Sequence, residues 1–182
     1  RDLHSFPTRR SSDLRSGHLA YGTTAEGLKE IQKIHKDINN QVIANAPKDL
    51  TINTHVCRGN FHSTYANSGA YDPVADILFG EENVNAYYLE FDDERSGGFA
   101  PLAKVSGDKK VVLGLITTKS PKLENKEEVI ARIKEAANYI PLDRLYLSPQ
   151  CGFASCEIGN KLTEKEQWDK LRLVKEIAEE VW

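Results

Sequence analysis

Three things are scarce in this sequence: surplus positive charge, long apolar runs and cysteines. Its 182 residues include 24 lysines and arginines against 27 aspartates and glutamates, which leaves no basic excess to follow the phosphates of a nucleic acid. No stretch approaches the roughly 20 consecutive apolar residues of a membrane span, and the start lacks the apolar core of a secretory signal. We therefore expect a soluble, cytoplasmic protein with no nucleic-acid or membrane partner.

The cysteine content narrows the chemistry. Three cysteines are an odd number and too few for a disulfide framework. We therefore expect the cysteines to serve in metal binding or redox chemistry. The length is sufficient for one ordinary domain with a sizeable core. Nothing in the composition indicates an oligomeric state.

Residues 1–14 differ from the rest of the chain. This segment (RDLHSFPTRRSSDL) is rich in Ser and Arg, has no helical or alternating period, and resembles translated adapter or vector DNA. A transit peptide is the alternative, but Asp2, Asp13 and the lack of an amphipathic face disfavour it. We predict that residues 1–14 are a non-native or disordered lead and that residues 15–182 form the domain.

From residue 23 onward, helix and strand patterns alternate. Apolar residues at helical spacing predict helices over residues 23–46, 125–140 and 163–181, each opening on a capping residue with a glutamate three positions later. Four β-branched or apolar runs predict strands over residues 51–57, 86–91, 111–117 and 144–147. The last helix is expected to bury Trp168, Leu171, Val174, Ile177 and Val181.

This rhythm predicts an α/β fold with a parallel sheet. Strands roughly thirty residues apart with helices between them are typical of βαβ units. A closed (β/α)8 barrel takes about 250 residues, so four units would make about half of one and leave unpaired strand edges. An open doubly wound sheet is the alternative, but the turn after the first strand, residues 57–60, lacks the G-x-G-x-x-G pattern of that fold.

Potential metal ligands stand at the carboxyl ends of three predicted strands. His55 and Cys57 lie two positions apart and therefore on one face, and Cys151 follows the fourth strand. Glu90 lies near the end of the second strand, inside an otherwise apolar and aromatic run. Two sulfurs, one nitrogen and one oxygen match the preferences of four-coordinate zinc.

The residues alone leave a simpler interpretation open. A lone strand-end histidine is more often a hydrogen-bonded structural residue, and a lone cysteine is more often a small buried hydrophobe. Glu90 could pair with Arg95, and Cys156 is expected to be a packing residue or a free thiol. We expect His18, His35 and His62 to have no metal role. H-x-C is a weak motif, and spacing does not decide between the two interpretations.

Four segments carry a family resemblance: THVCRGNF, YYLEFDDERSG, VVLGLITTKSPKLE and LYLSPQCGFAS. Together they resemble the carboxyl-terminal catalytic barrel of the cobalamin-independent methionine synthase family, especially its shorter single-barrel relatives. The similarity runs from about residue 17 to the end and covers the later half of such a barrel. It implies a (β/α)8 TIM-barrel type fold for residues 15–182, with His55, Cys57, Glu90 and Cys151 as ligands of Zn2+.

The resemblance also implies an activity. The family transfers a methyl group from 5-methyltetrahydropteroyl(poly)glutamate to homocysteine, giving methionine. The chain departs from the full-length enzymes at Gln150, where they have Asp, at residues 152–155, and at Arg58-Gly59. These departures leave open a methylcobalamin-dependent methyltransferase, another thiol acceptor, or an inactive truncated fragment that binds zinc.

Overall fold

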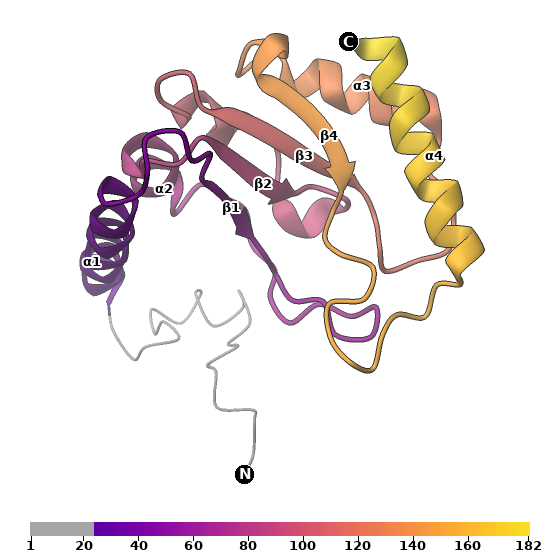
Figure 1. Cartoon of the computed structure of the whole chain (residues 1–182), viewed down its shortest axis with the longest axis horizontal. Coiled ribbons are helices and arrows are strands. Elements are labelled where there is room, and N and C mark those ends of the chain that lie inside the picture. The colour runs from indigo at the N-terminus through magenta and orange to yellow at the C-terminus, as the bar shows by residue number, and fades with distance from the viewer. Residues whose placement is uncertain (1–23) are drawn as a thin grey trace.

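The computed structural model describes residues 24–182 (Figure 1). Residues 1–14 and His18 lie outside the described residues, so what was predicted for them stays a prediction. Three short 3-10 segments, Glu94–Ser96, Ala100–Lys104 and Leu142–Arg144, accompany the main elements. In chain order the main elements are α1 (Ala25–Ala44), β1 (Asn53–Val56), α2 (Ala75–Glu81), β2 (Ala86–Glu90), β3 (Lys110–Ile116), α3 (Lys126–Ala136), β4 (Leu145–Pro149) and α4 (Glu164–Val181).

The four strands form one parallel sheet in the order β1-β2-β3-β4. The predicted α/β class and the four predicted strands are confirmed, with ends shifted by one or two residues. Among the described strands the order follows the chain without the reversal that defines a doubly wound sheet. Each strand is instead added beside its predecessor, as in a (β/α)8 barrel.

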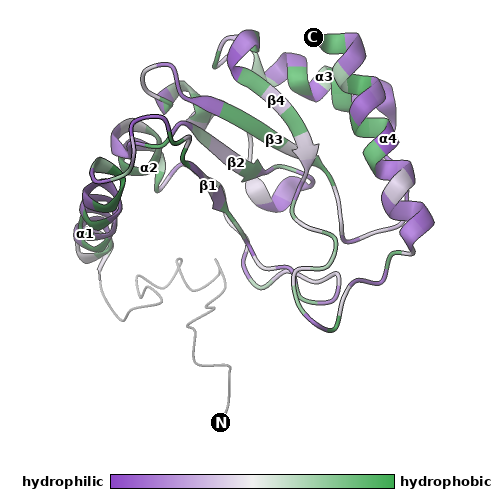
Figure 2. Ribbon diagram, viewed as in Figure 1, coloured by the Kyte–Doolittle hydropathy of each residue, from purple (hydrophilic) through white to green (hydrophobic). Residues whose placement is uncertain are grey.

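One face of the sheet is covered and the other is open. Alternate residues of β2 and β3, such as Tyr87 and Val111, pack with helix residues including Phe79 and Ile133 in a single core. On the opposite face Tyr88 is 40% exposed and helps to line a hollow of about 760 Å³. Most of β3 is green in Figure 2, and this apolar character fits its central position.

Helix ends follow the predicted capping in two cases of three. Thr163 and Glu166 form a complete capping box at α4, and the Asn125 side chain accepts from the Glu128 amide at α3. At α1 the prediction of Thr23 as the cap is wrong, because the Thr24 side chain accepts from the Gly27 amide. The cap therefore lies one residue later than expected.

The burial of two helices also differs from expectation. Trp168 was predicted to be buried in α4 but is 52% exposed, and the buried residues of α4 are Lys170, Leu173 and Ile177. The Lys170 ammonium is satisfied there by the Glu124 carboxylate, at 3.0 Å from both oxygens. Helix α1 has no fully buried residue, because it packs beside α2 at the edge of the molecule (Figure 1).

Candidate metal centre

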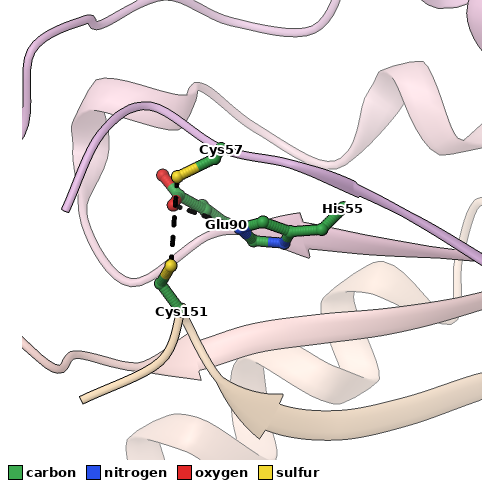
Figure 3. A group of neighbouring side chains, drawn as sticks. All are labelled: His55, Cys57, Glu90 and Cys151. Carbon is green, nitrogen blue, oxygen red and sulfur yellow. Dashed lines mark hydrogen bonds and ion pairs between the residues drawn. The ribbon is translucent and has the colours of Figure 1, made fainter. Parts of the chain in front are cut away.

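The four predicted ligand residues converge at the carboxyl end of the sheet (Figure 3). His55 lies in β1, Cys57 directly follows β1, Glu90 is the last residue of β2, and Cys151 stands two residues past β4. One nitrogen, one oxygen and two sulfur atoms lie within 4.8 Å of one another. Their meeting follows from a parallel sheet, in which the carboxyl ends of all strands share one edge.

The spacing of the donor atoms fits a single ion. The Cys57 and Cys151 sulfurs are 3.9 Å apart, and His55 Nε2 lies 3.8 Å from Glu90 Oε1. Tetrahedral zinc with Zn–S bonds of about 2.3 Å separates its two sulfurs by about 3.8 Å. The two thiols therefore already stand at the separation that one shared zinc ion requires.

The orientation of His55 is set by the strand next to it. His55 is paired with Tyr88 in the sheet register, and its Nδ1–H donates to the Tyr88 carbonyl at 3.0 Å. That bond fixes the tautomer and leaves Nε2 facing Glu90 and the sulfurs. The hydrogen-bonded structural role that the sequence left open for His55 is therefore compatible with a ligand role for Nε2.

The carboxyl group of Glu90 is fully buried, at 0% exposure. Its Oε1 accepts from Gln150 Nε2 at 3.0 Å, and its Oε2 accepts from the Arg58 amide at 3.2 Å. Arg95 lies 3.7 Å from Oε2 but bonds Asp92 more closely, at 2.8 Å, and also pairs with Asp93. Because a buried carboxylate is costly unless paired or metal-bound, the centre favours a cation beside it.

The two thiols influence each other. Hydrogen bonding from Cys57, and then the interaction with His55, lowers the pKa of Cys151 to about 3. Hydrogen bonding to Cys151, followed by burial, raises the pKa of Cys57. The same Cys151 sulfur raises the pKa of His55. The surroundings thus favour a thiolate at Cys151 and a protonated thiol at Cys57, and a divalent cation can replace the proton of Cys57.

Arg58 and Tyr71 support Glu90 from the side of the core. The Tyr71 hydroxyl donates to the Glu90 carbonyl, at 3.2 Å, and accepts from the Glu90 amide, at 2.9 Å, and from Arg58 Nη1, at 2.6 Å. The guanidinium of Arg58 also stacks over the Tyr71 ring. Sequence reasoning did not find this pair, since residues 58–74 carry no periodic pattern and Tyr71 has no ligand-type side chain.

Asn60 and Lys119 form hydrogen bonds that connect the loops around the candidate centre. The Asn60 side-chain amide donates to the Gly152 carbonyl at 2.5 Å and to Ser155 Oγ at 2.7 Å. Its oxygen accepts from Lys119 Nζ at 3.1 Å. Loops that follow β1, β3 and β4 are therefore joined beside Cys151, and sequence reasoning assigned no role to either residue.

His35, His62 and Cys156 lie apart from this group. His35 is exposed on α1, and His62 lies in the loop that follows β1. Cys156 is a free thiol and is not among the four converging residues. The expectation that His35, His62 and Cys156 have no metal role stays a prediction.

Fold and site together define a parallel α/β barrel-type domain with a candidate metal centre, rich in sulfur, at the carboxyl ends of its strands. Residues 24–180 match the family model described as the catalytic domain of cobalamin-independent synthase. The chain belongs to the cobalamin-independent methionine synthase family, and the predicted resemblance is confirmed.

Curated relatives support the same placement. The chain is 52% identical over 164 residues to the uncharacterized protein YxjG of Bacillus subtilis, covering 90% of this chain and 43% of that protein. It is 29% identical over 103 residues to a methionine synthase of Pyrococcus abyssi, covering 57% of this chain and 27% of that protein. The chain thus spans less than half the length of these relatives.

Solved structures show the same fold. A crystal structure described as a vitamin-B12 independent methionine synthase from Listeria monocytogenes superposes with a TM-score of 0.64 at 38% identity, covering 83% of this chain and 41% of that one. A B12-independent methionine synthase from Shewanella, in complex with selenomethionine, gives a TM-score of 0.68 at 21% identity, covering 84% and 44%. The described sheet accordingly corresponds to part of their (β/α)8 barrel.

No helix within residues 24–182 is long and apolar enough to cross a membrane.

Proposed function

We propose that this chain carries the zinc-binding part of an enzyme that transfers a methyl group to a thiol. The most direct reaction is from 5-methyltetrahydropteroyl(poly)glutamate to homocysteine, with methionine as product. The observation that carries the proposal is the meeting of two sulfurs, one imidazole nitrogen and one buried carboxylate oxygen within 4.8 Å. A relative from Herpetosiphon aurantiacus, 28% identical over 111 residues, is named 5-methyltetrahydropteroyltriglutamate--homocysteine methyltransferase.

The donor set matches the chemistry of thiol methylation. When bound, zinc supplies the acceptor as a thiolate at neutral pH, whereas a free thiol has a pKa near 8.5. Two protein thiolates, one carboxylate and Zn2+ sum to a net charge of −1, which preserves nucleophilicity of a bound sulfur and disfavours activation of a carbonyl group.

In the proposed reaction, residues of this chain hold and orient the candidate metal ligands. The Tyr88 carbonyl fixes the ring of His55, and Gln150 fixes the carboxylate of Glu90. The open face of the sheet borders the candidate centre, since a pocket of about 320 Å³ is lined by both His55 and Cys151. A thiol entering that pocket meets the donor atoms while the rest of the substrate remains on the open face.

The identity of the methyl donor is a separate part of the proposal. Gln150 and residues 152–155, where the sequence departs from the full-length enzymes, adjoin the candidate ligands. A corrinoid-bound methyl group is therefore the alternative donor. Assays with methyl-folate and with methylcobalamin, each with homocysteine as acceptor, separate the two, and transfer from methylcobalamin alone would contradict the folate proposal.

Metal analysis of the purified chain tests the centre itself. We expect about one equivalent of zinc, lost in His55→Ala and Cys151→Ser because each removes one of four donors. Cys156→Ser is the matched control, since this thiol lies outside the converging group and its loss should leave the zinc content unchanged. Less than about half an equivalent in the unaltered chain, or full zinc in both ligand variants, would contradict the site.

A further inference from the structure

A buried ion pair joins helix α4 to the loop that follows β3. The side chain of Lys170 is 0% exposed, and its ammonium donates to both carboxylate oxygens of Glu124 at 3.0 Å. It also donates to the Lys122 carbonyl at 2.8 Å. All three N–H donors of the ammonium are therefore used inside the protein, and they hold residues 122–124 against the helix.

Glu124 also binds the residue that directly follows β3. Its Oε1 accepts from the Thr117 amide at 2.8 Å. The next residue, Thr118, is buried, and its hydroxyl donates to Gln150 Oε1 at 2.9 Å. Gln150 Nε2 in turn donates to Glu90 Oε1 at 3.0 Å. A series of hydrogen bonds, continued by the peptide bond between Thr117 and Thr118, therefore runs from α4 to a candidate metal ligand.

A buried lysine is an energetically costly way to pack this helix. Removing an ammonium and a carboxylate from water costs free energy that their attraction often offsets only in part, so that apolar residues of similar volume are frequently as stable. The other two buried residues of α4, Leu173 and Ile177, are apolar. The ion pair at Lys170 is therefore explained better by the position that it imposes on the loop than by a gain in stability.

We propose that Lys170 is a positioning residue for the candidate metal centre, and that it acts on the Glu90 carboxylate through the loop that follows β3. The proposal rests on the proposed function, because it takes Glu90 to be a metal ligand. Lys170 is not among the four converging residues, so its effect on the metal comes from where it holds the loop. If the loop shifts, Thr118 no longer orients the Gln150 amide, and Glu90 loses the donor that fixes its Oε1.

Zinc affinity, measured by competition with a chromophoric chelator, tests the proposal without turnover. Lys170→Met removes the charge and keeps the length of the side chain, and Glu124→Ala removes the partner. We expect each variant to bind zinc about tenfold more weakly, the low end of the effect of removing a direct partner of a ligand. Lys165→Met is the matched control, since it breaks an exposed ion pair with Asp169 on the same helix and should leave zinc affinity unchanged.

A double-mutant cycle separates positioning from a merely structural role. In the chain that carries Gln150→Ala the connection to Glu90 is already broken, so Lys170→Met should weaken zinc binding there by less than about twofold. Urea denaturation of each variant without metal measures stability. A merely structural role predicts a lower denaturation midpoint with unchanged zinc affinity of the folded chain.

The possible outcomes distinguish this proposal from the proposed function. A full tenfold loss on the Gln150→Ala background, or unchanged zinc affinity in both Lys170→Met and Glu124→Ala, would overturn the role of Lys170 and leave the proposed function standing. Absence of zinc binding by the unaltered chain would overturn both. If Lys170→Met does not fold, Glu124→Ala in the unaltered and Gln150→Ala backgrounds decides by the same criteria.

Discussion

At the scale of single residues, the side chain of Gln150 connects the buried carboxylate of Glu90 to Thr118 in the loop that follows β3. Its Nε2 donates to Glu90 Oε1 at 3.0 Å, and its Oε1 accepts from the Thr118 hydroxyl at 2.9 Å. The side chain is buried, and the two bonds fix which way its amide points. Under the proposed zinc role, Gln150 acts through Glu90, as a positioning residue rather than as a ligand.

We expect Gln150→Ala to weaken zinc binding by about 10- to 100-fold, the range typical when a partner of a metal ligand is removed. Competition with a chromophoric chelator measures this affinity. Thr118→Val removes only the hydroxyl that orients Gln150, so its effect should be smaller and in the same direction. Zinc affinity in Gln150→Ala equal to that of the unaltered chain would contradict the role.

Some residues of the candidate site could be predicted from the sequence and others could not. His55, Cys57, Glu90 and Cys151 were predicted because strand ends are recognisable in the sequence and ligand-type side chains stand there. Their convergence within 4.8 Å agrees with that prediction, and their role as ligands stays a prediction. Tyr71 was not predicted, because it contacts Glu90 through a backbone bond to a residue 19 positions away, which leaves no local pattern.

At the scale of elements, the centre depends on a close approach between β3 and its neighbours. Gly114 is paired with Glu90 in β2 and with Ser148 in β4. A Cβ atom at Gly114 would lie 2.8 Å from both Gln150 Cα and the Leu89 carbonyl oxygen, and both are backbone atoms. Glycine therefore allows the segment that carries Gln150 and Cys151 to pass close to β2.

Gly114→Ala should destabilise the fold by about 1–3 kcal/mol, as overpacking in a well-packed core does. It should also weaken zinc binding, because relief of the clash moves Gln150 away from Glu90. Urea denaturation and the chelator competition measure the two effects. Gly98→Ala is the control, since a Cβ there meets nothing within 4 Å. An unchanged denaturation midpoint in Gly114→Ala would contradict this reading of the packing.

Prediction of the elements succeeded where periodicity was long and failed where it was short. The four strands and the helices α1, α3 and α4 were predicted, since each repeats its pattern over several residues. Helix α2 was not predicted, because its seven residues offer fewer than two helical repeats. The error at Trp168 arose because helical spacing predicts which residues share a face but not which face the core will cover.

At the scale of the whole molecule, the sheet has an open face and two edge strands. Tyr88 is 40% exposed on the open face, and β1 and β4 each have a single strand neighbour among the described residues. The chain spans less than half of the relatives that it matches. Unpaired strand edges present free N–H and C=O groups that favour association.

We therefore expect the 182-residue chain, expressed alone, to be poorly soluble or to self-associate. Sedimentation velocity over a range of concentrations measures this. Tyr88→Lys, which places a charge on the open face, should reduce association, whereas Tyr139→Lys, at a position that is similarly exposed but outside the hollow, should not. A stable monomer at all concentrations would contradict the expectation.

The spread of the four donor groups over β1, β2 and β4 has a consequence for the order of assembly. A nascent chain that has emerged only as far as β3 presents His55, Cys57 and Glu90 but lacks Cys151. Under the proposed zinc role, ion capture with full affinity waits until β4 has docked beside β3, because only then does the fourth donor arrive. Metal loading would thus mark the completion of the sheet, and immature chains would compete poorly for scarce zinc in the cell.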